Sequence, residues 1–127
     1  MLFRSTRSGK LPCQIVIHTV GPWYKDLPKV QADSLLRECV LNVLETAKAL
    51  GLASVSLTAI STGRGGYPVK ECAQVMVDAV VSFCTLHDTK ALKLIKFNNF
   101  EKNIYQEFQA QMKQKVEESA KDNDEDA

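Results

Sequence analysis

A glycine-rich turn between a strand pattern and a helix pattern is the feature that most constrains the fold of this chain. Residues 55–60 are mostly apolar, and a helical pattern begins at Val69. The turn that joins them consists of Ser61, Thr62, Gly63, Arg64, Gly65, Gly66, Tyr67 and Pro68. A strand that enters a helix through such a turn is typical of α/β folds. We therefore expect the turn to lie at the carboxyl end of a strand, where α/β sheets bind their ligands.

The same turn predicts an anion site. Glycine lets the backbone approach an anion closely and direct several N–H groups at it. The following helix adds unpaired N–H groups and the positive end of its dipole, and Pro68 suits its first turn. The alternative is a tight connection that binds nothing, because glycine-rich turns are common. The turn lacks the Lys and Ser/Thr that close a Walker loop and the spacing of a dinucleotide fingerprint.

Strand and helix patterns alternate along the rest of the chain. Strands are predicted at residues 14–20, 54–60 and 92–97, and helices at residues 33–50, 69–84 and about 101–116. Asp33 or Ser34 is expected to cap the first helix, and Gly51 to end it. Residues 1–12 carry weak structure signals. The order β-α-β-α-β-α implies parallel strands with right-handed crossovers.

Charge and length limit the classes of function. The chain has 127 residues, which is at most one domain, and a net charge of +1. Residues 117–127 hold six acids and one base, or −5, so the remainder carries +1 minus −5, or +6. A mildly basic body suits an anionic ligand such as a pyrophosphate and is compatible with RNA or with a plain solvated surface. The acidic residues 117–127 are expected to be a disordered tail.

The sequence gives little sign of metal binding, histidine catalysis, nucleic-acid binding or membrane insertion. The four cysteines form no C-x-x-C pair, so we expect buried reduced thiols in an intracellular protein and no metal site. His18 lies mid-strand without a nearby carboxylate and is expected to be structural. Lys93 and Lys96 lack interleaved aromatic residues, which does not favour a nucleic-acid surface. No apolar run is long enough to span a bilayer, and we expect no signal peptide.

Two separated motifs resemble the macro domain. Residues 11–24, LPCQIVIHTVGPWY, resemble one signature of this family, and residues 58–68, TAISTGRGGYP, resemble its later phosphate-binding loop. The match is most similar to macro domains of the poly(ADP-ribose) polymerase-related group. The resemblance implies a three-layer α/β/α fold with a mostly parallel sheet, truncated at the N-terminus.

The resemblance also implies an ADP-ribose site. Residues Ser61 to Tyr67 would hold the diphosphate through backbone N–H groups, and Tyr67 would lie against the distal ribose. Asn98 and Asn99 would fall near the sugar or base end, and Arg64 would add charge or point to solvent. The implied partners are ADP-ribose or ADP-ribosylated proteins, without a cofactor, metal, RNA or membrane. The implied setting is a larger multidomain protein in the nucleus or cytoplasm.

The chain departs from the family in its first half. The Asn-Ala-Ala-Asn-type strand end, the Gly-Gly-Gly loop and the early aspartate have no counterpart, so residues 1–116 are expected to be a partial domain. We therefore expect this chain to be a fragment, an alternative isoform or the product of a misassembled gene model. The family's central strand would lie between the strands at 14–20 and 54–60, which must otherwise pair directly or keep unpaired edges.

Catalysis is not assigned to any residue, because the catalytic residues of the hydrolase members lie largely in that absent half. The leading hypothesis is therefore a binding module for ADP-ribose on modified proteins. The alternatives are an ADP-ribosyl hydrolase whose catalytic half is missing and an orphan fragment that binds nothing or binds RNA loosely.

Overall fold

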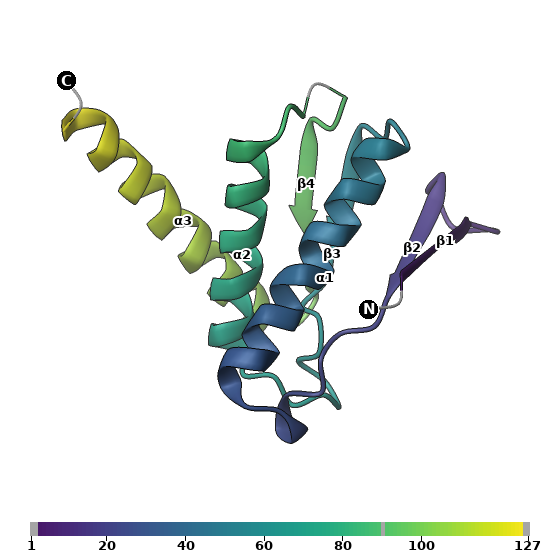
Figure 1. Ribbon diagram of the computed structural model, residues 1–127, viewed down its shortest axis with the longest axis horizontal. Helices are drawn as coiled ribbons and strands as arrows, with labels where there is room; N and C mark the ends of the chain where they lie inside the picture. Colours follow the sequence, from purple (N-terminus) through teal and green to yellow (C-terminus); the bar gives the residue numbers. More distant parts are fainter. Residues whose placement is uncertain (1–2, 90, 126–127) are drawn as a thin grey trace.

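The structure is a computed structural model that describes residues 3–89 and 91–125. Its elements alternate along the chain as Figure 1 shows. They are β1 (Phe3–Arg7), β2 (Ile15–Thr19), the 3-10 helix η1 (Tyr24–Asp26), α1 (Lys29–Ala49), β3 (Ser54–Leu57), α2 (Val69–Leu86), β4 (Leu94–Phe97) and α3 (Lys102–Glu125). The alternating α/β order predicted from the sequence is confirmed, with β1 and η1 in addition.

The helices form one layer in which α2 packs between α1 and α3. Each helix turns an apolar stripe inward, as the period of 3.6 residues requires. Leu36, Val40 and Leu44 of α1 and Met76 and Phe83 of α2 are at most 1% exposed. A fully buried side chain of this kind contributes about 1.5–3 kcal/mol, so the contact between α1 and α2 is a main source of stability.

The strands form a second layer against these helices. Val55 and Leu57 of β3 and Ile95 and Phe97 of β4 pack into the core, and the Phe97 ring makes a tilted contact with Phe108 of α3, with ring centroids 5.0 Å apart. The alternate side chains on the opposite face, Ser54, Ser56, Leu94 and Lys96, are exposed. The described residues therefore supply two of the three expected layers, with all three helices on one face of the strands.

The strands are divided between two small sheets. β3 pairs with β4 in parallel, and β1 pairs with β2 antiparallel. Among the described residues β2 and β3 do not pair, and a cavity of about 790 Å³ lies between them. Of the two expected outcomes, direct pairing or unpaired edges, the structure has unpaired edges. The predicted mostly parallel arrangement holds for β3 and β4 only.

Two features of the N-terminal part differ from the sequence-based predictions. β1 was not predicted; it turns back onto β2 through a turn in which Gly9 has a φ of +60°, a conformation that glycine adopts readily. The prediction that Asp33 or Ser34 caps the first helix is wrong, because Pro28 occupies the N-cap position and α1 begins at Lys29. Proline fixes a φ suited to entering a helix, so α1 starts four residues early.

The last helix extends further than the sequence predicted. The structure describes α3 through Glu125, across most of the segment expected to be a disordered tail. Residues 117–121 are exposed, so this part of the helix relies on local bonds. One of these is the Gln114 to Glu118 hydrogen bond, and another is the Lys115–Glu118 ion pair. Residues 126 and 127 lie outside the described residues.

Two further expectations concern the cysteines and membrane-spanning segments. Within the described residues no cysteine forms a disulfide; Cys39 and Cys72 are buried, whereas Cys13 and Cys84 are exposed. The expectation of buried thiols therefore holds for two of the four. No helix in the described ranges is long and apolar enough to cross a membrane.

A polar cluster joins the three helices and predicts an acid-sensitive contribution to stability. Asp78 of α2 accepts hydrogen bonds from Arg37 of α1 at 2.6 Å and from Lys115 of α3 at 3.1 Å. Partial burial raises the pKa of Asp78, but the bonds from Lys115 and Arg37 outweigh it and lower the pKa overall. The folded state therefore binds this proton more weakly than the unfolded state does.

We expect Asp78→Asn to lower the free energy of unfolding at neutral pH, and we expect this loss to shrink as the pH falls below about 4 and through the lowered pKa of the folded state. Urea unfolding of both proteins between pH 3 and pH 8 measures this difference. A difference between the two proteins that is independent of pH would contradict the assigned ion pairs.

Candidate functional site

The glycine loop, defined here as residues 61–67, is held in shape by its own backbone. The Tyr67 N–H donates to the Ser61 carbonyl at 2.9 Å, and the Gly66 N–H donates to the Gly63 carbonyl at 3.1 Å. The Thr62 hydroxyl donates to the Ala59 carbonyl at 2.9 Å. Ser61 itself has a φ of 65°, a left-handed conformation that is uncommon for a residue with a side chain. The loop is therefore a defined turn closed between Ser61 and Tyr67.

Two of its glycines are required by the protein itself. A Cβ at Gly65 would lie 2.8 Å from the Ser61 carbonyl oxygen, which is too close for any side chain. Gly66 has a φ of +72°, and a Cβ there would meet the Lys25 side chain at 2.4 Å. Gly63 differs, because a Cβ at this position would have nothing within 4 Å. Gly63 therefore borders open space beside the loop.

The loop leaves a row of donors for an anion. Among the described residues, no protein acceptor takes the backbone N–H groups of Thr62, Gly63, Arg64 and Gly65. The next element, α2, begins at Val69 with Pro68 at the N-cap position, and its first-turn N–H groups have no intrahelical partner. The Arg64 side chain is exposed. A loop amide row beside a helix N-terminus is an arrangement that binds phosphate groups.

The segment after β2 braces the loop from one side. A Cβ at Gly21 would lie 2.3 Å from the Ser61 hydroxyl oxygen and 2.4 Å from an Ile60 methyl, so this backbone passes directly over the start of the loop. Further along, the Tyr24 N–H donates to the Gly65 carbonyl at 3.0 Å. The carboxyl end of β2 and the glycine loop are therefore in contact, although β2 and β3 are not paired.

The Tyr67 side chain points into the protein. It is 2% exposed, its ring lies 4.7 Å from the Tyr24 ring, and its hydroxyl donates to Asp33 of α1. Asp33 also pairs with Lys29 at 2.6 Å. Burial and then the bond to Asp33 raise the pKa of Tyr67 well above its ordinary value. The ring thus anchors the loop to α1, and its predicted contact with a ribose stays a prediction.

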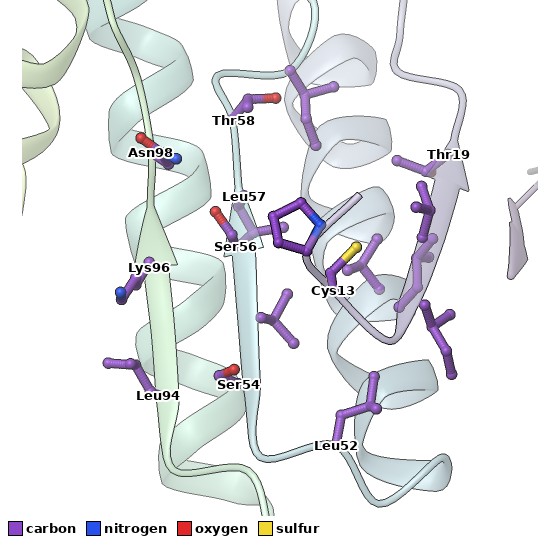
Figure 2. Close-up of a pocket in the computed structure, with 17 residues that line it drawn as sticks. Cys13, Thr19, Leu52, Ser54, Ser56, Leu57, Thr58, Leu94, Lys96 and Asn98 are labelled. Atoms are coloured by element: carbon purple, nitrogen blue, oxygen red, sulfur yellow. The ribbon is translucent and has the colours of Figure 1, made fainter. Parts of the chain in front are cut away.

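Asn98 and Asn99 follow β4 at the same edge. The Asn99 side-chain oxygen accepts the Ala59 N–H at 2.8 Å, which ties the end of β4 to the residues that lead into the loop. Its amide nitrogen is buried and has no hydrogen-bond partner among the described residues. Asn98 lies beside the cavity between β2 and β3, as Figure 2 shows, and its N–H donates to the Leu57 carbonyl at 2.7 Å.

Sequence reasoning missed Phe100, which directly follows this pair. Its side chain is 94% exposed, which is the highest value among the large apolar side chains of the described residues. An exposed phenylalanine ring presents a flat apolar face that a ligand can cover. The signal in the sequence was an aromatic residue just past the carboxyl end of a predicted strand.

The described residues also bear on metal binding and on the surroundings of His18 and Cys72. No cluster of three potential metal ligands is present within the described ranges. His18 is exposed and pairs with the Thr6 hydroxyl at 2.9 Å across β1 and β2, in line with its predicted structural role. Burial raises the pKa of the Cys72 thiol to about 12, so this thiol stays protonated at neutral pH.

Comparisons with known proteins agree with this geometry. The Macro domain family matches residues 3–76. An O-acetyl-ADP-ribose deacetylase of Escherichia fergusonii is 43% identical over 82 residues, which is 65% of this chain and 46% of that protein. A macrodomain of Oceanobacillus iheyensis solved with ADP is 34% identical, with a TM-score of 0.84 over 91% of this chain and 59% of that chain. A Trypanosoma brucei macrodomain in complex with ADP-ribose is 29% identical, with a TM-score of 0.75 over 84% of this chain and 43% of that chain.

The chain belongs to the Macro domain family. It spans about half the length of the curated relative from Escherichia fergusonii and 59% of the Oceanobacillus chain. The macro-domain fold expected from the two sequence motifs is confirmed. The narrower similarity to the poly(ADP-ribose) polymerase-related group stays a prediction.

The anchoring of Tyr67 predicts a loss of stability at alkaline pH. Because its pKa is raised, the folded state holds the phenolic proton more tightly than the unfolded state. Its contribution is therefore full below about pH 10 and declines as the pH rises further. We expect Tyr67→Phe to cost about 1–2 kcal/mol at pH 7, since the bond to Asp33 is lost, and to reduce the alkaline decline.

Urea unfolding at pH 7 to 11 measures this effect, with Tyr105→Phe as the matched variant, since Tyr105 is 37% exposed. We expect the loss of unfolding free energy at alkaline pH to be smaller in Tyr67→Phe and unchanged in Tyr105→Phe. An equal change in both variants would contradict the assigned anchor.

Proposed function

We propose that this chain binds ADP-ribose through the glycine loop, with the diphosphate on the backbone N–H groups of residues 62–65. The observation that carries the proposal is the row of unused donors beside the N-terminus of α2. Backbone donors in a fixed loop suit a diphosphate, because hydrogen bonds to charged groups contribute about 1.5–3 kcal/mol each. The basic body of the chain, at +6 outside the acidic residues 117–127, favours the same ligand.

The comparisons support this choice of ligand. The similar macrodomains of Oceanobacillus iheyensis and Trypanosoma brucei were solved with ADP and with ADP-ribose, respectively. The first of these overlaps with 91% of this chain at a TM-score of 0.84. ADP-ribosylated proteins would present the same chemical group and are the proposed macromolecular partners.

The end of β4 provides a second part of the proposed site. Asn99 fixes this end to the residues before the glycine loop, and the exposed Phe100 ring follows it. An aromatic face next to a phosphate loop suits the adenine base, which stacks on such rings. Asn98, which is exposed beside Phe100, would be available to the base or its ribose.

Hydrolysis of an ADP-ribose derivative is a second candidate function, favoured by the name of the Escherichia fergusonii relative. The described residues contribute no evident nucleophile or base, and the chain spans 46% of that relative. Release of acetate from O-acetyl-ADP-ribose by this chain would support hydrolysis. Binding of ADP-ribose without acetate release would support the binding module.

Gly63 provides a test of the diphosphate position. A side chain at this position meets no protein atom and has no positive φ to strain it, so the fold should tolerate it. We expect Gly63→Glu to weaken ADP-ribose binding at least about tenfold, because its carboxylate would lie near the diphosphate. Calorimetric titration measures the affinity.

The matched control for this test is Gly63→Gln, which has the same length without the charge. It should bind more tightly than Gly63→Glu. Unchanged binding in Gly63→Glu would show that the glycine loop is only a turn.

Phe100 provides a test of the base end. We expect Phe100→Ala to weaken ADP-ribose binding by about fivefold to a hundredfold, since stacking of a base on an aromatic ring contributes about 1–3 kcal/mol. Phe100→Trp preserves an aromatic face and should retain most of the affinity. Ribose 5-phosphate, which has no base, should bind both variants equally. Equal ADP-ribose affinity in Phe100→Ala and the unmodified chain would refute the stacking.

A further inference from the structure

A second, polar pocket lies between α2 and α3, formed by residues other than those of the glycine loop. Its volume is about 330 Å³, which is within the range of small-ligand sites. The two helices pack against each other and separate toward the end of α3, as Figure 1 shows. Of the seven described residues that line the pocket, three are glutamines, two are acids and one is a lysine. Its occupant would therefore be held by hydrogen bonds and charge.

Gln111 of α3 points to a ligand in this pocket. It is 8% exposed, and among the described residues it is the only buried polar side chain. Its amide lines the pocket and has no hydrogen-bond partner among the described residues. A buried amide without a partner is unfavourable, and such groups are nearly always satisfied in folded proteins. The partner of this amide must therefore come from the pocket.

The pocket offers more acceptors than donors. A carboxylate has about four lone-pair positions. Asp78 uses two of them, for Arg37 and Lys115, and Glu118 accepts one hydrogen bond, from Gln114 at 3.3 Å. Lys115, the only cation among the described lining residues, is already engaged by Asp78 at 3.1 Å and by Glu118 at 3.6 Å. A complementary ligand is therefore rich in donors.

The surroundings of the pocket favour a cation. Within the pocket Arg37 and Lys115 balance Asp78 and Glu118, but residues 117–127 as a whole carry −5. Negative charge near the C-terminal end of a helix is unfavourable, because the helix dipole is negative at the same end. The last turn of α3 has no basic residue to offset it. A cation bound beside this part of α3 would relieve both effects.

Among cations, a guanidinium group fits this set of side chains best. It has five N–H donors in one plane and no acceptor, so it can bond to an amide oxygen and a carboxylate together. It is also more weakly hydrated than an ammonium group, so it loses less on leaving water. The chain already uses this chemistry on the same cluster, because Arg37 donates to Asp78 at 2.6 Å.

We propose that the pocket between α2 and α3 binds an arginine side chain from a basic segment of a partner protein. The guanidinium would bond to the Gln111 amide oxygen and the Glu118 carboxylate, and the flanking basic residues of the partner would face the acidic end of α3. This proposal does not depend on ADP-ribose binding by the glycine loop.

The probe for this proposal is a peptide of Gly-Ser-Arg repeats with blocked ends, titrated into the full chain without any nucleotide. Two matched peptides replace each arginine by lysine or by citrulline, which has the same shape without the charge. A salt concentration of about 0.15 M screens long-range attraction. We expect saturable binding of the arginine peptide, with nuclear magnetic resonance shifts at the Gln111 side-chain amide. The lysine peptide should bind at least about threefold more weakly and the citrulline peptide at least about tenfold more weakly.

Two neighbouring glutamates provide a matched test of the pocket. Glu117 and Glu118 are both exposed on α3, but only Glu118 lines the pocket. We expect Glu118→Gln to weaken binding of the arginine peptide about fivefold to tenfold, because a charged hydrogen bond is lost. Glu117→Gln removes the same charge from the same helix and should weaken binding less than about twofold.

The buried amide is tested by Gln111→Leu. This variant should bind the arginine peptide at least about tenfold more weakly, and its free energy of unfolding in urea should not fall, because it removes a buried amide that has no partner. Gln106→Leu alters an exposed glutamine of the same helix that does not line the pocket. It should bind as the unmodified chain does.

Several results would overturn the proposal. The absence of binding or equal binding of the three peptides would exclude a guanidinium site. An equal change in Glu117→Gln and Glu118→Gln would show a general attraction to the acidic residues. A lower free energy of unfolding in Gln111→Leu would show that this amide is satisfied within the fold. Binding of free arginine as tightly as the peptide would assign the pocket to a small molecule instead of a partner protein.

Discussion

The contact between Gly21 and the start of the glycine loop is the constraint on which the rest of the site depends. At this point the backbone after β2 lies against Ile60 and Ser61, so close that no side chain would fit at residue 21. β2 and β3 do not pair among the described residues, and this contact takes the place of sheet pairing at the carboxyl ends of the two strands. The segment after β2 and the glycine loop are therefore held together, even though β2 and β3 themselves do not pair.

The loop is fixed from three directions. Tyr24 donates to the Gly65 carbonyl from the segment after β2, Tyr67 bonds to Asp33 of α1, and Asn99 accepts the Ala59 N–H from the end of β4. None of these bonds uses a backbone N–H of residues 62–65. A loop held in this way presents its donors in a preformed arrangement, so that binding an anion costs little additional ordering.

Local patterns predicted the helices and the position of the glycine loop. α2 begins at Val69 as expected, because Pro68 suits a helix start and the apolar period continues from there. The start of α1 was misjudged because Asp33 resembles a cap in the sequence, whereas its carboxylate is engaged by Tyr67 and Lys29. α3 passes the predicted end because charged, helix-favouring residues sustain it without burial.

Features that depend on distant residues were harder to predict. β1 has no apolar alternation and exists through its pairing with β2. The inward direction of Tyr67 depends on Asp33, which lies 34 residues earlier, and the role of Asn99 depends on Ala59, 40 residues earlier. The unpaired edges of β2 and β3 were foreseen as one of two outcomes, through the resemblance to a family and not through composition or periodicity.

The central claim is that the amides of the glycine loop hold the diphosphate of ADP-ribose. The most direct measurement is a titration of the isotope-labelled chain with ADP-ribose, followed through the backbone amide resonances in nuclear magnetic resonance spectra. The account predicts that the largest shifts occur at Thr62, Gly63, Arg64 and Gly65, and that adenosine, which lacks the diphosphate, leaves these four resonances in place. Saturable shifts that avoid residues 62–65, or none at millimolar ligand, would contradict it.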